Sequence, residues 1–279
     1  MKKIIRIGIF VFGIVFLCTG CDGNVTRDIR HAGYTLSGDS FVCENFSFKN
    51  EATGEMVNKI RYLTSTHIIG EDGKVFEISL SKKYLDGQNC YDIGSKVYVQ
   101  ALFDNKVAKS VDNKYYYLVG QNNSPSYSAV PTSDNSYNIY NLLLKANDVL
   151  KVMTADSSKG LYYVLKKDGN VYGYTVSSSD RNSPPKVTST QIVYNKSDYY
   201  GPIIDFNYEG NSLNTYVKTQ DRIFRLKMTN GKDCTQYAGV QCEFQMEEDT
   251  ILYKHYKRIV AYNGAMLITD YGKVFTVSS

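Results

Sequence analysis

The chain has 279 residues, with 32 Lys or Arg against 28 Asp or Glu, a formal charge of +4. Three of the bases, Lys2, Lys3 and Arg6, lie in an N-terminal segment without an acid, and without them the counts are 29 and 28. So small an excess gives no support for the basic stripe that a nucleic-acid-binding protein needs, and we expect no nucleic-acid partner. At 43% hydrophobic and 22% charged, the composition excludes a disordered chain and a polytopic membrane protein.

The N-terminal segment has the layout of an export signal. After the three bases, an unbroken run of apolar residues and Gly extends from Ile7 to Leu17. This run is shorter than the ~20 apolar residues that a transmembrane helix needs. We therefore expect residues 1–20 to be a cleaved signal peptide.

The signal ends in Leu17-Cys18-Thr19-Gly20-Cys21, which resembles the lipobox of the bacterial lipoprotein family. Cys18 stands where that family prefers Leu. The resemblance implies that Cys21 becomes the lipidated N-terminus, and acyl chains on it would anchor the protein to the membrane. It also implies the extracytoplasmic face of the bacterial cell membrane, with a secreted protein as the alternative.

Residues 21–40 contain few apolar side chains and many Gly, Asp, Ser and Thr residues. We expect them to be the lipidated N-terminus and a flexible tether, and residues 41–279 to form the folded domain. The tether would be followed by a strand-like segment at residues 41–48.

Four further cysteines, Cys43, Cys90, Cys234 and Cys242, suggest two disulfides in an exported chain. Cys234 and Cys242 flank a short segment that contains Gly, so we expect them to pair and to leave Cys43 for Cys90. Free thiols or a zinc site are the alternatives. The chain has no C-x-x-C pair, and its three His are scattered, so we expect no metal and no cofactor.

One hairpin pattern recurs along the chain. It joins a β-prone run, a polar turn, and a Val or Ile followed by an aromatic residue; Asp-Gly, which suits a tight turn, occurs in two copies. Four clear copies and one degenerate copy lie at residues 67–78, 163–174, 216–226, 266–277 and 110–119.

A second marker precedes each hairpin: a short β-prone stretch that usually begins with a base. These stretches are Lys59-Ile60, Lys96-Val97, Lys151-Val152, Ile203-Ile204 and Arg258-Ile259. Five modules of this kind predict an all-β fold, specifically a five-bladed β-propeller, with a two-sheet β-sandwich as the alternative. We expect residues 41–48 to complete the last blade by pairing near residues 274–277. Residues 134–151 fit an outer strand or a short helix equally well.

The hairpin motif Asp-Gly-x-Val-aromatic, as in Asp72-Gly73-Lys74-Val75-Phe76, is similar to the repeats of the chromosome-condensation-regulator (RCC-type) propeller family. The likeness covers about ten residues of each module, and the Gly-rich tail of that family's repeat is absent. It implies the propeller architecture and no nucleotide-exchange function.

The chain contains no Walker loop, G-x-S-x-G elbow, H-E-x-x-H or EF-hand motif. Its high Tyr content, 25 residues, favours a binding module that engages an envelope protein or a glycan through loops, with Tyr116, Tyr162 and Tyr199 as candidate contacts. The alternative is a glycan hydrolase, which needs two carboxylates at a fixed separation. Asp156, Asp205 and Asp270 are the candidate catalytic residues for it.

Overall fold

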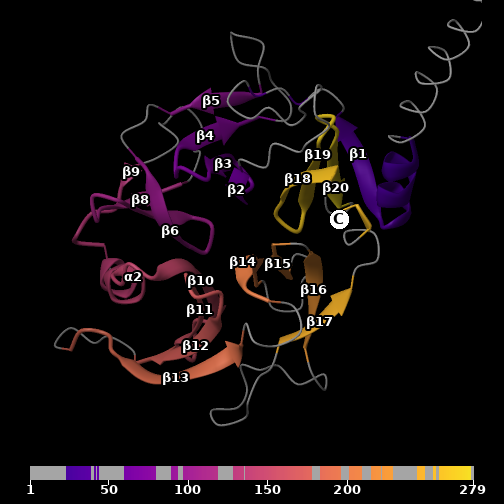
Figure 1. Cartoon of the computed structure of the whole chain (residues 1–279). Coiled ribbons are helices and arrows are strands. Elements are labelled where there is room, and N and C mark those ends of the chain that lie inside the picture. The colour runs from indigo at the N-terminus through magenta and orange to yellow at the C-terminus, as the bar shows by residue number, and fades with distance from the viewer. Residues whose placement is uncertain are drawn as a thin grey trace, which may run out of the picture.

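The computed structural model describes residues 23–38, 41, 43, 60–79, 89–93, 97–118, 128–134, 136–177, 183–195, 201–208, 215–220, 222–228, 244–248, 254–255 and 258–277. Antiparallel strands dominate these residues, so the expected all-β class is confirmed. Four consecutive strands form one unit, and the units lie side by side around a common centre (Figure 1).

The first two units are β2 (Ile60–Leu63), β3 (His67–Gly70), β4 (Val75–Ile78) and β5 (Cys90–Asp92), then β6 (Val99–Phe103), β7 (Val107–Ser110), β8 (Tyr115–Tyr117) and β9 (Ser128–Ala129). The third and fourth are β10 (Val149–Asp156), β11 (Leu161–Lys166), β12 (Val171–Val176) and β13 (Val187–Tyr194), then β14 (Ile203–Asn207), β15 (Tyr216–Thr219), β16 (Ile223–Met228) and β17 (Phe244–Glu248). The fifth combines β18 (Ile259–Tyr262), β19 (Met266–Thr269), β20 (Val274–Val277) and β1 (Tyr34–Gly38).

The predicted hairpins are the second and third strands of these units, and the β-prone markers lead into the first strands. The second and third units join into one sheet through a parallel contact between β6 and β10. The described strands therefore form four hydrogen-bonded sheets, and the two-sheet sandwich is wrong.

The first strand of every described unit carries the same irregularity. Its pairing with the second strand skips one residue after the first pair, as between Ile60 and Tyr62 or between Ile203 and Asp205. The other three skips lie between Val99 and Ala101, Val149 and Lys151, and Ile259 and Ala261. A β-bulge bends and twists a strand. Its repetition at one position shows that the five units are structural repeats.

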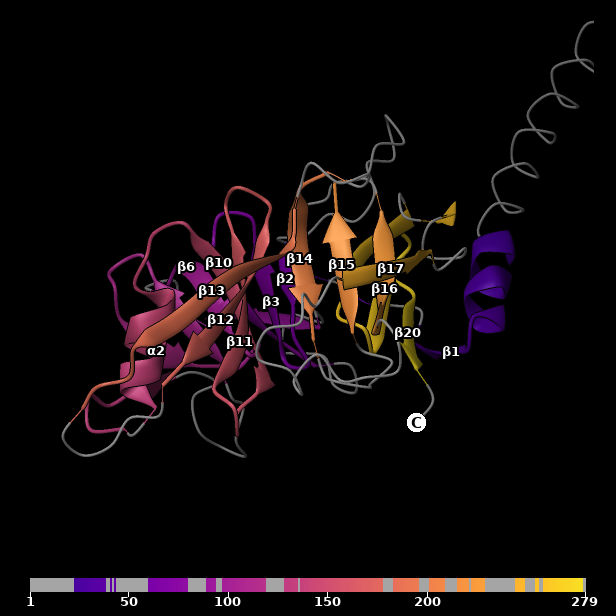
Figure 2. The ribbon, with the colours of Figure 1, turned by 90° about the horizontal axis from the view of Figure 1, so that it is seen from below.

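Each unit has two kinds of short turn, at opposite ends of its strands. The turns between first and second strands define what we call the 1–2 face, and those between second and third strands define the 2–3 face. Parallel β6 and β10 give two units the same direction, and an Asn263 to Thr64 hydrogen bond joins 1–2 turns of the fifth and first units. Figure 2 shows the strands of neighbouring units running alongside one another across the molecule.

The 2–3 turns also join one unit to the next. Gly169 has a positive φ of 82°, and its carbonyl accepts a hydrogen bond from the Ile203 amide at 3.0 Å, at the start of β14. A Cβ at Gly169 would lie 2.3 Å from the Cβ of Pro202. Gly therefore serves two needs here, a left-handed backbone and a close approach of two units.

The last unit is completed by a strand from the N-terminal part of the chain, but not by the expected one. β1 pairs with β20, with Tyr34 opposite Val277 and Leu36 opposite Phe275. The expectation that residues 41–48 fill this place is wrong. Of that segment, the described Phe41 donates its amide to the carbonyl of Gly272 at 2.9 Å, in the turn before β20 begins.

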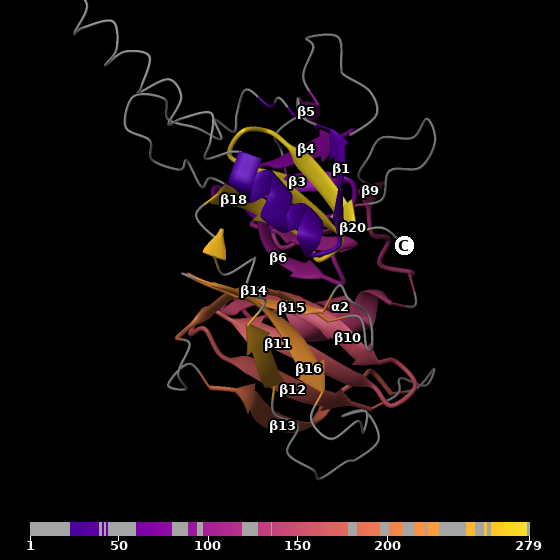
Figure 3. The same ribbon diagram turned by 90° about the vertical axis from the view of Figure 1, so that its right-hand side faces the viewer.

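The predicted tether is also wrong for most of its length, since residues 23–31 form a helix that leads into β1. Val25 and Ile29, four residues apart, point inward and are buried with Tyr34 in one hydrophobic cluster. The outer residues of this helix are polar, which gave the segment its tether-like composition. Figure 3 shows the indigo helix lying across the outside of the fifth unit.

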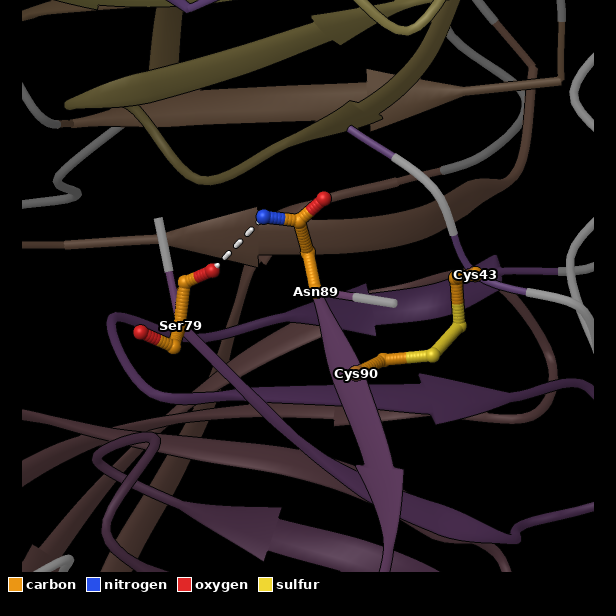
Figure 4. Close-up of a disulfide and its surroundings, with 4 residues drawn as sticks. All are labelled: Cys43, Ser79, Asn89 and Cys90. Carbon is orange, nitrogen blue, oxygen red and sulfur yellow. Dashed lines mark hydrogen bonds between the residues drawn. A yellow bond between two sulfur atoms is a disulfide. The ribbon is translucent and has the colours of Figure 1, made fainter. Parts of the chain in front are cut away.

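Cys43 and Cys90 form the expected disulfide, with 5.4 Å between their Cα atoms (Figure 4). Cys90 begins β5, the last strand of the first unit, and the Asn89 side chain beside it donates to the Ser79 carbonyl at 3.1 Å. Because Phe41 contacts the fifth unit, the segment from Phe41 to Cys43 connects the fifth unit to the first. Cys21, Cys234 and Cys242 lie outside the described residues.

Hydrophobic clusters fill the space between neighbouring units. Among the described residues, one such cluster lies between each successive pair, including the fifth and the first; representative members are Val75 with Val99, Phe103 with Val164, Leu165 with Phe206, Tyr216 with Leu267, and Val260 with Ile68. Burial between sheets therefore continues around the whole centre. The ambiguous segment 134–151 contains a helix, α2 (Tyr137–Leu144), before β10 begins, and no described helix is long and apolar enough to cross a membrane.

Candidate functional site

The residue after the bulge holds an equivalent register position in each of the five first strands. In three units this residue faces Ile69, Leu165 or Ile268 on the second strand, and in two it faces a Lys. The five equivalent residues are Tyr62, Ala101, Lys151, Asp205 and Ala261. The polar residues at this position in the first, third and fourth units, together with Tyr216 and Lys218 on the strand beside Asp205, are the candidate site, which we call the axial cluster: Tyr62, Lys151, Asp205, Tyr216 and Lys218.

A buried ion pair forms the core of the axial cluster. The Lys151 Nζ on β10 donates to the Asp205 Oδ1 on β14 at 2.8 Å, and the two side chains are 1% and 4% exposed. The Tyr216 hydroxyl donates to the other carboxylate oxygen, also at 2.8 Å. Both oxygens of Asp205 are thus engaged, which offsets part of the cost of burying the charges.

Two tyrosines extend the cluster to the first and fifth units. The Tyr62 hydroxyl on β2 donates to the Leu150 carbonyl at 3.3 Å, and the Lys151 Nζ lies 5.4 Å from the centre of its ring. The Tyr216 hydroxyl is also 3.3 Å from the Tyr262 carbonyl on β18. Burial raises the pKa of both Tyr62 and Tyr216, and the Asp205 charge raises that of Tyr216 further, so both are neutral donors.

Lys218 is the member of the cluster without a hydrogen bond in the described part of the chain. It lies opposite Asp205 in the β14–β15 pairing and is 7% exposed. Burial lowers the pKa of its ammonium, although the charges of Asp205 and Glu71 act in the opposite direction. Lys109 takes the same place in the second unit, where its Nζ donates to the Lys145 carbonyl at 3.0 Å.

Amide and hydroxyl contacts cover the cluster toward the 1–2 face. The Asn105 Nδ2, in the 1–2 turn of the second unit, donates to the Asn207 Oδ1 of β14 at 2.9 Å. The neighbouring Asp104 accepts from both the amide and the hydroxyl of Thr154, each at 2.6 Å. These contacts fix the second unit to the third and the fourth.

The structure does not bring the three candidate catalytic carboxylates together. Asp156 ends β10 at the 1–2 face, where it accepts from the Ser158 amide and hydroxyl. Asp270 lies in a 2–3 turn on the opposite face and pairs with Arg258. Asp205 is buried between them with its two oxygens already bound, so the three carboxyl groups have separate environments.

The candidate Tyr contacts also have structural roles. Tyr162 is 9% exposed and packs against Phe103, with ring centres 5.9 Å apart, in the core between the second and third units. Tyr116 packs against the core between the first and second units. Tyr199 lies outside the described residues. Alternation in a strand places every second side chain inward, which accounts for both described residues.

Sequence reasoning missed Tyr62, Tyr216 and Lys218, and noted Lys151 only as the base that begins a marker. A Lys inside a β-prone run, as in Tyr216-Val217-Lys218, is the available signal, because strand interiors rarely bury an unpaired base. Among the described residues, no group of three His, Cys, Asp or Glu side chains could hold a metal ion. The chain matches no known family model, and no curated protein sequence matches it.

Proposed function

We propose that this protein is a lipid-anchored binding and scaffold module built on a five-bladed β-propeller. Five repeated four-stranded units, the bulge common to them and the cores between successive units support the propeller. The completion of the fifth unit by β1 supports it further, because this strand gives the last unit the same four strands as the others and ties residues 34–38 to residues 274–277.

The lipid anchor of the proposal is Cys21, exposed after removal of residues 1–20, on the extracytoplasmic face of the bacterial cell membrane. The Cys43–Cys90 disulfide supports an oxidising compartment. The net charge near zero gives no support for a nucleic-acid partner.

The observation that favours binding over glycan hydrolysis is the engagement of the Asp205 carboxylate within the axial cluster. Asp205 is bound to Lys151 and Tyr216, and Asp156 and Asp270 lie at opposite faces. No two of these carboxylates form the pair that a glycan hydrolase needs, so the hydrolase is not proposed. The proposed function is therefore binding, in which the rigid strands hold the surface turns in place for contact with a partner.

The 2–3 face is the proposed contact surface for an envelope protein or a glycan. It carries two exposed large side chains, Val111 in the turn after β7 and Tyr271 in the turn after β19. The Arg258 guanidinium lies 4.6 Å from the centre of the Tyr271 ring, so this surface joins an aromatic residue to a cation.

The test is photo-crosslinking in intact cells with p-benzoylphenylalanine in place of Val111, and in place of Ser158 on the 1–2 face as the matched control. We expect a discrete adduct of one protein from Val111 that Ser158 does not give, and that Tyr271→Ala reduces at least fivefold. For a glycan partner, the same variants are compared for binding to isolated cell-wall glycan. Equal results at both positions in both assays would contradict the proposal.

A further inference from the structure

The N-terminal helix bears on the position of the folded domain relative to the membrane. This inference rests on the proposed lipidation of Cys21. The helix is already formed at residue 23, two residues after Cys21. Two extended residues span only about 7 Å. An anchored domain therefore has no tether of the expected length, and its fifth unit lies beside the bilayer.

The inner side of this helix is firmly attached to the fifth unit. Val25 and Ile29 are buried, and Asp28 accepts from the Lys254 Nζ and faces the His255 Nε2, each at 2.9 Å. The hydrogen bonds from Lys254 and His255 hold the pKa of the Asp28 carboxyl well below its usual range. The helix and the unit thus behave as one body.

The outer side of the helix is basic. Arg27 and Arg30 are exposed and three residues apart, which places them on one side of a helix. Lys254 beside them has a side chain 65% exposed, and that of Arg27 is 62% exposed. Asp28 is the one acid of helix residues 23–31; its side chain is 14% exposed and pairs with both Arg27, at 3.4 Å, and Lys254, so these three residues keep one net positive charge, to which Arg30 adds a second.

We propose that this basic surface, formed by Arg27, Arg30 and Lys254, rests on the anionic headgroups of the membrane that holds Cys21. Its position beside the acyl-bearing residue and its charge fit that partner, because basic residues next to an anchor are attracted to anionic lipid. Figure 2 shows the helix running alongside the strands at the outer rim of the molecule. The propeller then stands on its edge, with its 1–2 and 2–3 faces both open to partners.

The experiment uses the lipidated protein in vesicles, with p-benzoylphenylalanine in place of exposed His31 at the far end of the helix. The matched control has it in place of Ile192, which is 52% exposed on β13, at the rim away from the helix (Figure 1). In vesicles with 30% phosphatidylglycerol, we expect the His31 position to crosslink to lipid at least fivefold more than the Ile192 position. Equal yields at the two positions would overturn the inference.

A charge variant tests the role of the arginines. Arg27→Gln with Arg30→Gln is expected to reduce the His31 crosslink at least fivefold, whereas Lys114→Gln with Lys159→Gln, two exposed bases elsewhere, is expected to leave it unchanged. An unchanged yield in the arginine variant would contradict the electrostatic contact. Mass analysis of the N-terminal peptide separates the two failures: missing lipid on Cys21 overturns the anchor itself, while lipid without a crosslink overturns only the orientation.

Discussion

The Lys151 ammonium and the Asp205 carboxylate lie 2.8 Å apart in the centre of the molecule, almost fully buried, and connect the first strands of the third and fourth units. Neither charge has access to bulk water, so each depends on the other for its stability. The Tyr216 hydroxyl completes the set from β15.

Lys151→Met is expected to lower the free energy of unfolding by about 3–5 kcal/mol, because it leaves the Asp205 charge buried with one partner removed. The double variant Lys151→Met with Asp205→Leu removes both charges and is expected to recover most of this loss. Urea denaturation of the four proteins of this cycle measures the coupling. Additive losses in the double variant would show that the pair does not act as a unit.

Lys218→Met is expected to have the opposite effect and to raise the free energy of unfolding by about 1–2 kcal/mol. The equivalent residues of three other units are Ile69, Leu165 and Ile268, so the site accepts an aliphatic side chain, and burial of the Lys218 charge is a cost. Thermal unfolding measures the change. A loss as large as that of Lys151→Met would mean that the Lys218 ammonium is a required partner of Asp205.

The pH dependence of the same variant gives a second prediction. Burial lowers the pKa of Lys218 in the folded protein below its unfolded value. The cost of its charge is therefore full below the folded pKa and disappears as the pH rises toward the unfolded pKa. The stability advantage of Lys218→Met is expected to shrink as the pH rises toward 10.5, the ordinary lysine pKa; a constant advantage would assign it to packing alone.

Gly272→Ala tests the contact that connects the N-terminal segment to the fifth unit. Gly272 has a φ of 73°, and a Cβ there would lie 2.7 Å from the Phe41 carbonyl oxygen. Gly201→Ala is the matched control, with a φ of 72° and no atom within 4 Å of the added Cβ. Both variants lose about 1 kcal/mol to backbone strain, and the Gly272 variant is expected to lose more in thermal unfolding. Equal losses would mean that the Phe41 contact adds no stability.

Removal of the disulfide by Cys43→Ser with Cys90→Ser is expected to reduce the free energy of unfolding by about 2–4 kcal/mol, because the bond closes a long loop. Its two cysteines are 47 positions apart in sequence. Denaturation of the variant with and without reductant measures the effect, and the wild type in reductant serves as the control. If the free energy of unfolding changes in neither comparison, packing alone stabilises the connection between the first and fifth units.

Local patterns in the sequence predicted the repeated part of the fold. Asp-Gly turns and a Val or Ile followed by an aromatic residue mark hairpins whose strands depend on neighbours in the chain, as in Val75–Ile78 and Val274–Val277. The Cys43–Cys90 pair followed from spacing and elimination.

The closing strand and the axial cluster depend on distant contacts, which local patterns do not contain. Residues 34–38 gain their partner from the far end of the chain, and their short alternation of Tyr34, Leu36 and polar residues was hidden in a polar segment. In the same way, Lys151 and Asp205 meet only after two units have folded side by side.

The most direct test of the account is the mass of the N-terminal peptide of the protein isolated from its native membrane. The account predicts that this peptide begins at Cys21 and carries a diacylglyceryl group on the thiol, with or without a third acyl chain on the amine. A peptide that begins elsewhere, or an unmodified Cys21, would contradict the lipid-anchored module.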